Sequence, residues 1–223
     1  FVSWTPKRWL TLDFGMLLIP LTHHTVQGAT SLNTLDYHTA VVRYPKESTK
    51  VWRDTGISAR GLLLDDRVQY RVGVFGGIRR ATGRKDAAGM ALPDLNPNGV
   101  PRFAGNLRFN LLDPEPETFP QGIYLGKKRV VSFGIAADYQ PDASAVGGEV
   151  NDYFAIGGDI FVDLPLGTRD QELVAQANVL HYRHGDGSAS SGTGFFVEAG
   201  YRFGKIEPVV AYEAFLSDAD TAD

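Results

Sequence analysis

One stretch, residues 194–215, constrains the fold more than any other. Every second residue in its first half is apolar, and the set is Phe195, Val197, Ala199, Tyr201 and Phe203. The alternate positions hold the other set, which mixes charges with glycine: Phe196, Glu198, Gly200, Arg202 and Gly204. After a turn at 204–205 the alternation resumes, with Val210 and Tyr212 on one face and Glu213 on the other. Alternation over eight or more residues predicts β-strands and argues against a helix.

The same alternation recurs along the chain. It predicts about ten strands of about ten residues, the others lying near residues 1–4, 9–18, 51–64, 67–75, 102–112, 129–139, 152–164 and 173–182. A short helix is expected only near residues 30–41. Two architectures fit strands of this kind. A soluble sandwich would bury the apolar face against a second sheet. A transmembrane barrel would turn that face to lipid and keep the charged face in a wet lumen.

The connections between the predicted strands alternate in length. Those near 5–8, 65–66, 164–170 and 204–205 are short, whereas those at 19–50, 78–101, 140–151 and 184–193 are longer. Only the proline-rich connection at 113–128 departs from the rule. Short turns on one rim and long loops on the other are typical of an outer-membrane barrel. The predicted strands are also longer than the roughly 5–6 residues usual in soluble sheets. We therefore expect an all-β, antiparallel, up-and-down transmembrane β-barrel.

The composition and the motifs argue against several other classes of protein. The net charge is −4 and cysteine is absent, so neither a basic nucleic-acid surface nor a disulfide or thiolate site is expected. No run approaches the ~18 apolar residues of a membrane-spanning helix. The loop histidines His23, His24 and His38 lack a fixed ligand spacing, and no nucleophile elbow or phosphate loop is present. We expect no enzyme activity, no cofactor and no metal.

Four segments carry a family resemblance. They are RDTGISARGLLLDDRVQYRVGVFGG at 53–77, LLDPEPETFPQGIYLGKKRVVSFGIAADYQ at 111–140, DYFAIGGDIFVDLPL at 152–166 and FFVEAGYRFGKIEPVVAYE at 195–213. Together they resemble the phosphate-selective porin O and P family of Gram-negative outer membranes. The resemblance implies a barrel of 16 strands, a homotrimer and outer-membrane lipid as its surroundings. Residues 1–223 would then be a single porin β-barrel domain, truncated at both ends and carrying about ten strands.

The alternation also predicts which charges face inward. The candidate pore-lining residues are Arg60, Arg71, Arg108, Arg202, Asp138, Asp159, Asp163, Glu198 and Glu213. In the family that the chain resembles, basic residues line the constriction and select phosphate. The resemblance therefore makes a constriction-loop candidate of the basic stretch with Arg79, Arg80, Arg84 and Lys85. Any structural pairing of inward Arg with Asp or Glu would weaken ion selection.

The expected function is passive diffusion of small hydrophilic solutes or ions, including anions such as phosphate, through a water-filled channel. The alternative is a soluble β-rich module that binds carbohydrate or another ligand, with Trp4, Trp9 and Trp52 as stacking platforms. A third reading is a barrel that serves as an adhesin or enzyme scaffold through its long loops. The apolar face separates the first two, because a channel exposes it and a binding module buries it.

Overall fold

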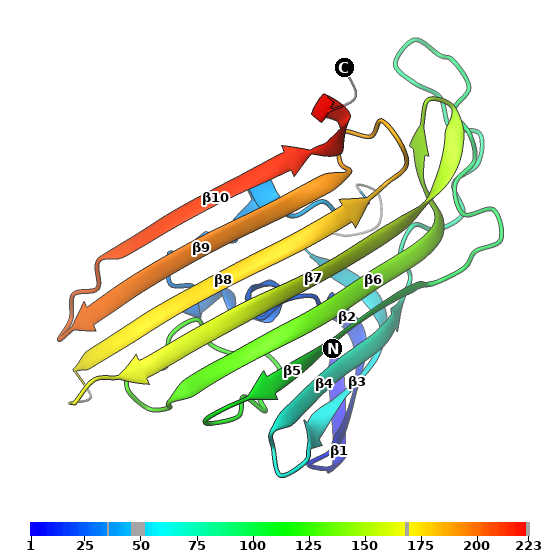
Figure 1. The fold of residues 1–223 in the computed structure, drawn as a ribbon. Helices are drawn as coiled ribbons and strands as arrows, with labels where there is room; N and C mark the ends of the chain where they lie inside the picture. The colour runs from blue at the N-terminus through cyan, green and yellow to red at the C-terminus, as the bar shows by residue number, and fades with distance from the viewer. Residues whose placement is uncertain (35, 46–51, 168–169, 222–223) are drawn as a thin grey trace.

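Ten antiparallel strands form one continuous sheet, in which each strand pairs with its neighbours along the chain (Figure 1). The computed structural model describes residues 1–34, 36–45, 52–167 and 170–221. The strands are β1 (Val2–Lys7), β2 (Leu10–Leu18), β3 (Arg53–Leu63), β4 (Val68–Phe75), β5 (Arg102–Asn110), β6 (Val130–Val146), β7 (Glu149–Pro165), β8 (Gln171–Arg183), β9 (Gly192–Phe203) and β10 (Val209–Ser217). The expected all-β, up-and-down topology is confirmed.

The sheet is curved but open. Strands β1 to β4 bend away from the plane of β7 to β10 (Figure 1). Among the described residues, the outermost strands β1 and β10 each pair with one neighbour, β2 and β9 respectively. The described residues therefore form a wall and not a closed barrel.

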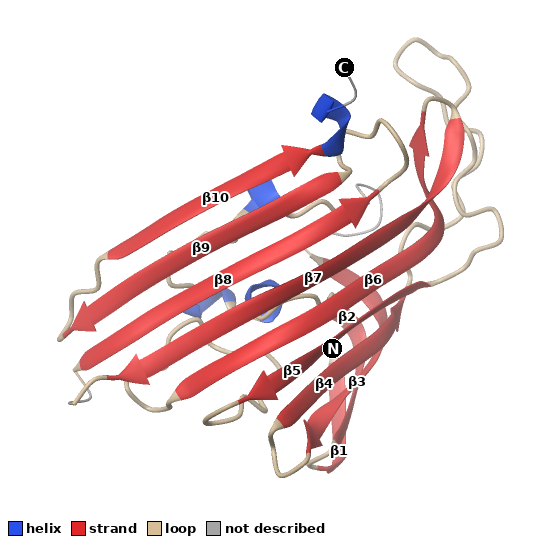
Figure 2. Cartoon of the chain, viewed as in Figure 1, coloured by secondary structure: helices blue, strands red, loops and turns tan. Residues whose placement is uncertain are grey.

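In the described parts of the chain, helix is confined to four short 3₁₀ turns, three of which lie on one side of the sheet (Figure 2). These three are η1 (His24–Val26), η2 (Ala29–Ser31) and η3 (Thr39–Val41), and η4 (Asp218–Thr221) follows β10. They replace the single short helix expected near residues 30–41. Among the described residues, no helix is both long and apolar enough to cross a membrane.

The longest hairpin corrects one expectation. Residues 140–151 are not a long loop, because β6 and β7 run on to a two-residue turn at Gly147–Gly148. Both glycines have positive φ, as the tightest hairpin turns require. In the sequence, Pro141 is a residue at which a strand is expected to end. In the structure it lies where the β6–β7 register shifts, between Gln140 and Ser144. A bulge accommodates proline within a strand.

The two faces of the sheet differ. The apolar sets predicted from the alternation project from the convex face, where Ile57, Ile135 and Ile160 are each more than half exposed. The charged and polar sets project from the concave face and are buried. A hydrophobic cluster lies on that concave side near the long-loop rim, and includes Ile19, Leu21, Phe75, Tyr153 and Tyr182. A smaller one around Tyr124 and Phe161 lies on the same face. The core of the protein therefore lies between the concave face of the sheet and the connecting segments that pack on that face.

Candidate functional site

Two connections cover the concave face, and we call them the first inserted segment (residues 19–45) and the second inserted segment (residues 111–129). In the first, Ile19 and Leu21 are fully buried, and the His24 ring lies 4.7 Å from the ring of Phe196 on β9. In the second, the backbone N–H of Tyr124 donates to Asp163 Oδ2 on β7 at 2.6 Å. The concave face is thus packed against chain and is not simply open to water.

Prolines explain why these segments leave the sheet. The last backbone hydrogen bond beside β2 runs from Ile19 N to Trp52 O at 3.1 Å. Pro20 follows at once and has no N–H with which to continue the ladder. In the second segment the ladder ends with Asp113 N to Arg129 O at 2.9 Å, directly before Pro114. Pro116 and Pro120 then prevent a further strand.

All nine candidate pore-lining residues lie on the concave side. Eight are partly or fully buried strand residues of β3 to β9, and Glu213 on β10 is the ninth. Their charges are mostly paired. Arg60 Nε donates to Asp13 Oδ2 at 2.8 Å, Arg108 donates to Asp159, and Arg202 Nε donates to Glu172 Oε2 at 2.8 Å. These arginines therefore stabilise the wall as ion pairs.

Arg71 is held differently, by backbone oxygens. Its two terminal nitrogens donate to the carbonyl oxygens of Thr118 and Glu117, both at 2.7 Å. Arg60 reaches the same segment through Pro116 O at 2.9 Å and Thr118 Oγ1 at 2.7 Å. The two arginines thus fasten the second inserted segment to β3 and β4.

A fully buried arginine, Arg102, was missed among the sequence candidates. Its Nε donates to Asp138 Oδ1 at 2.8 Å, and Tyr153 donates its hydroxyl to Asp138 Oδ2 at 3.0 Å. The guanidinium also lies over the Tyr44 ring, 4.7 Å from its centroid. The signal was present in the sequence, because Arg102 lies an even number of residues from Arg108 and so shares its face. Glu172, the partner of Arg202, was missed in the same way.

The middle of the concave face holds a buried chain of polar contacts. His23 Nε2 lies 2.8 Å from Glu115 Oε1, and the Tyr124 hydroxyl donates to the same oxygen at 2.7 Å. Burial opposes the charge on Glu115, but His23 and Arg108 outweigh it and hold the pKa of Glu115 below its usual range. Burial and Glu115 together raise the pKa of Tyr124. The two inserted segments are therefore bonded to each other as well as to the sheet.

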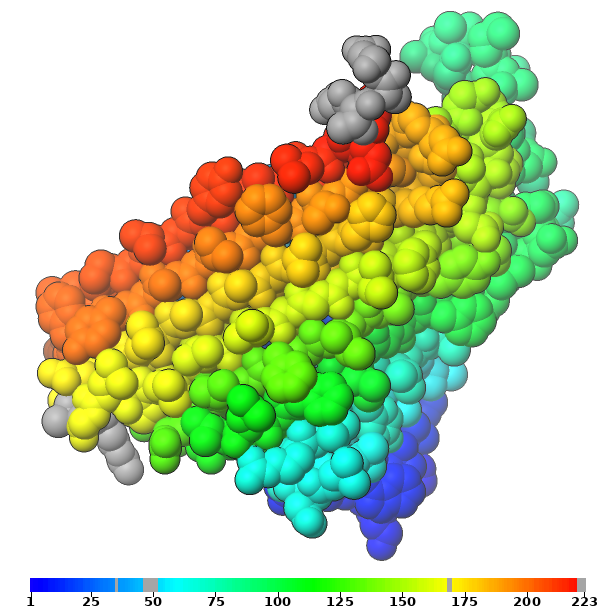
Figure 3. All heavy atoms as spheres, viewed as in Figure 1, coloured from blue at the N-terminus to red at the C-terminus, as the bar shows by residue number. Residues whose placement is uncertain are grey.

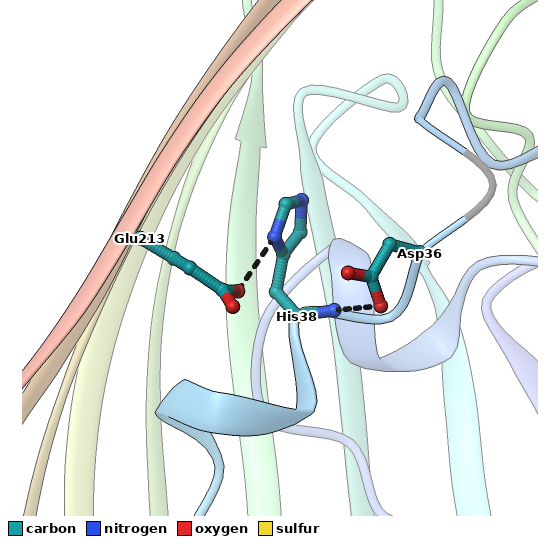
Figure 4. Close-up of side chains that lie close together, drawn as sticks. All are labelled: Asp36, His38 and Glu213. Carbon is teal, nitrogen blue, oxygen red and sulfur yellow. Dashed lines mark hydrogen bonds and ion pairs between the residues drawn. The ribbon is translucent and has the colours of Figure 1, made fainter.

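A cluster of acidic side chains surrounds His38, and Figure 4 shows two of them, Asp36 and Glu213. Its Nδ1 lies 2.8 Å from Glu213 Oε2 on β10, and its Nε2 lies 3.1 Å from Glu198 Oε2 on β9. The backbone N–H of His38 donates to Asp36 Oδ1 at 3.1 Å. Burial disfavours the charged imidazole, yet hydrogen bonds to Glu198 and Glu213 outweigh burial and raise the pKa of His38.

A second histidine, His24, lies next to this cluster, and its pKa is shifted in the opposite direction. The His24 ring is 5.2 Å from that of His38. Burial and the neighbouring His38 charge lower the pKa of His24 to about 4. The pKa values of these two neighbouring histidines are therefore shifted in opposite directions.

The basic stretch lies elsewhere. Arg79, Arg80 and Lys85 are exposed and Arg84 is half-buried. Their connection extends past the ends of the strands at the long-loop rim (Figure 1). Ile78 and Leu95 of the same connection pack in the hydrophobic cluster on the concave side.

The three tryptophans do not form one platform. Trp4 and Trp9 are more than half exposed, on β1 and on the turn that follows it. Trp52 is half-buried beside the first inserted segment, with its ring 4.6 Å from that of Tyr37.

Comparison with known proteins assigns this chain to no family. No protein-family model, no curated protein and no solved structure matches this chain.

Proposed function

We propose that this chain forms the wall of an outer-membrane β-barrel porin, through which small hydrophilic solutes or ions diffuse. One observation carries the proposal: the convex face is exposed and apolar. Within 131–139 on β6, 154–164 on β7 and 195–203 on β9, the outward positions are apolar or glycine. The set is Val131, Phe133, Ile135, Ala137, Tyr139, Phe154, Ile156, Gly158, Ile160, Val162, Leu164, Phe195, Val197, Ala199, Tyr201 and Phe203. Soluble monomers rarely expose a contiguous apolar patch of more than a few hundred Å².

The size and surroundings of this face support lipid as its partner. Side chains of neighbouring strands form a continuous surface, and no described inserted segment lies across the viewed face (Figure 3). Phe154 and Leu164 bound an outward apolar row on β7. The ten residue-to-residue steps between them, at ~3.3 Å each on a strand tilted by about 40°, span about 25 Å of membrane, close to the apolar band of such barrels.

The interior shapes the proposed channel. The two inserted segments narrow the lumen. Arg60, Arg108 and Arg202 pair with carboxylates, and Arg71 is bound by backbone oxygens. Ion preference then depends on side chains that still meet solvent beside the inserted segments, such as Asp36 and Glu213. The open edges β1 and β10 would pair with further strands to close the barrel.

Conductance tests the proposal. The purified intact protein, refolded in detergent and added to a planar bilayer under a salt gradient, should give discrete current steps. The reversal potential gives the ion preference. Protein that folds without detergent and gives no steps would overturn the proposal and favour the soluble binding module.

Cysteine substitution adds a spatial control, because the natural chain contains none. Thr39 is exposed on the first inserted segment, whereas Ile135 lies on the convex face. A water-soluble thiol reagent should reduce the current through Thr39→Cys and leave Ile135→Cys unchanged. The reverse pattern would mean that the apolar face meets water.

A further inference from the structure

The cluster around His38 has the composition of a transition-metal site. Asp36, His38 and Glu213 each offer one ligand atom, and these three atoms lie within 4.8 Å of one another. Two of the side chains come from the first inserted segment and the third from β10, and they point toward one another (Figure 4). Imidazole nitrogen and carboxylate oxygen are ligands that Zn²⁺ and related first-row ions share.

The spacing of the three groups suits one ion after small adjustments. Two ligands bound at ~2.1 Å in a tetrahedral site lie about 3.4 Å apart. His38 Nδ1 and Glu213 Oε2 are 2.8 Å apart and would open slightly. Asp36 is exposed, so its side chain can move closer at little cost. The ion would replace the proton shared by His38 Nδ1 and Glu213, and binding would release that proton to solvent.

The other nitrogen of His38 provides an independent argument. A metal-bound histidine almost always donates its second N–H to a carboxylate, carbonyl or water, which fixes the ring and its tautomer. His38 Nε2 lies 3.1 Å from Glu198 Oε2, and Gln176 in turn donates to Glu198. The imidazole also stacks on Phe196, with ring centroids 4.1 Å apart. Nδ1 is thus held toward Glu213, and Asp36 lies next to the His38 backbone.

Access and charge agree with this arrangement. The Glu213 side chain is 32% exposed and Asp36 is exposed, so a hydrated ion can approach from the solvent side. Glu198 brings the number of carboxylates around the single imidazole to three. We propose that Asp36, His38 and Glu213 bind one divalent first-row transition ion such as Zn²⁺, with Glu198 as the positioning residue. The ion would link the first inserted segment to β10.

Zinc titration of the untagged, chelator-stripped protein tests this site. We expect one Zn²⁺ per chain, not displaced by millimolar Mg²⁺ or Ca²⁺, because those ions prefer oxygen ligands. Asp36→Asn and Glu213→Gln change accessible side chains and should each weaken binding by at least tenfold. Glu198→Gln should weaken it by about 10- to 100-fold while the stoichiometry stays at one.

The matched control is His181→Ala, which removes an exposed histidine on β8. It should bind Zn²⁺ as the natural protein does. Circular dichroism of each variant should retain the natural β-sheet signal. Absence of zinc binding by the natural protein, or unchanged affinity in both Asp36→Asn and Glu213→Gln, would overturn the proposal. The site does not depend on channel activity, so its failure would leave the proposed porin function intact.

Discussion

The convex and concave faces of the same strands invert the usual arrangement of a soluble protein. On β6 and β7, Ile135 and Ile160 project outward and are exposed, while Asp138 and Asp163 project inward and are fully buried. Water would favour the opposite arrangement, because buried charges need partners and exposed apolar area costs free energy. The difference teaches that specific pairing stabilises the concave face, whereas the convex face leaves apolar side chains exposed, which the proposed lipid surroundings would cover.

The two faces should therefore respond to opposite changes. The concave face is sensitive to removal of a charge, because the partner left behind has no water. The convex face is sensitive to addition of a charge, because its proposed surroundings are lipid. The following variants test that contrast, with unfolding by urea in lipid vesicles as the common measurement.

The largest expected effect comes from the concave face. Arg102→Met leaves Asp138 buried without its ion-pair partner, and breaking a buried pair costs about 3–5 kcal/mol of unfolding free energy. The control Arg80→Met replaces an exposed arginine and should change the free energy of unfolding by less than about 0.5 kcal/mol. Equal small effects of both variants would contradict the role of pairing on the concave face.

A charge on the convex face should have the next largest effect. Ile135→Arg places a cation in the middle of the apolar band, and near the bilayer midplane this costs about 2–4 kcal/mol. The control is Ile206→Arg, in the exposed turn between β9 and β10, where the cost should fall to about 0–1 kcal/mol. A neutral Ile135→Arg would mean that this face meets water.

The smallest of the three effects is pH-dependent and concerns the link between the inserted segments. The pKa of Glu115 lies below its ordinary value of 4.5 in the folded protein, so its stabilising charge is fully present above about pH 4.5. That stabilisation is lost as the pH falls through the lower folded value. Glu115→Gln should reduce stability at neutral pH and flatten the loss below pH 4.5. Glu149→Gln, at the exposed tip of the β6–β7 hairpin, should keep the natural profile.

The alternation of apolar and polar residues predicts only part of the fold and of the candidate site. It assigned Arg108 and Asp159 to one face, and on that face they form an ion pair. It could not give the extent of the β6–β7 hairpin, because Pro141 interrupts the pattern where a bulge lets the strand continue. The resemblance to the phosphate-selective porins and the trimer it implies stay predictions.

What the sequence by itself determined is the strand order and the face of each side chain, since a strand turns every second residue the same way. Only the tertiary structure decided what covers the charged face. His38 and Glu213 are 175 residues apart, and no local pattern relates them. They meet because Pro20 directs the first inserted segment behind the sheet and because the sheet's curvature gives that segment a concave surface to fill.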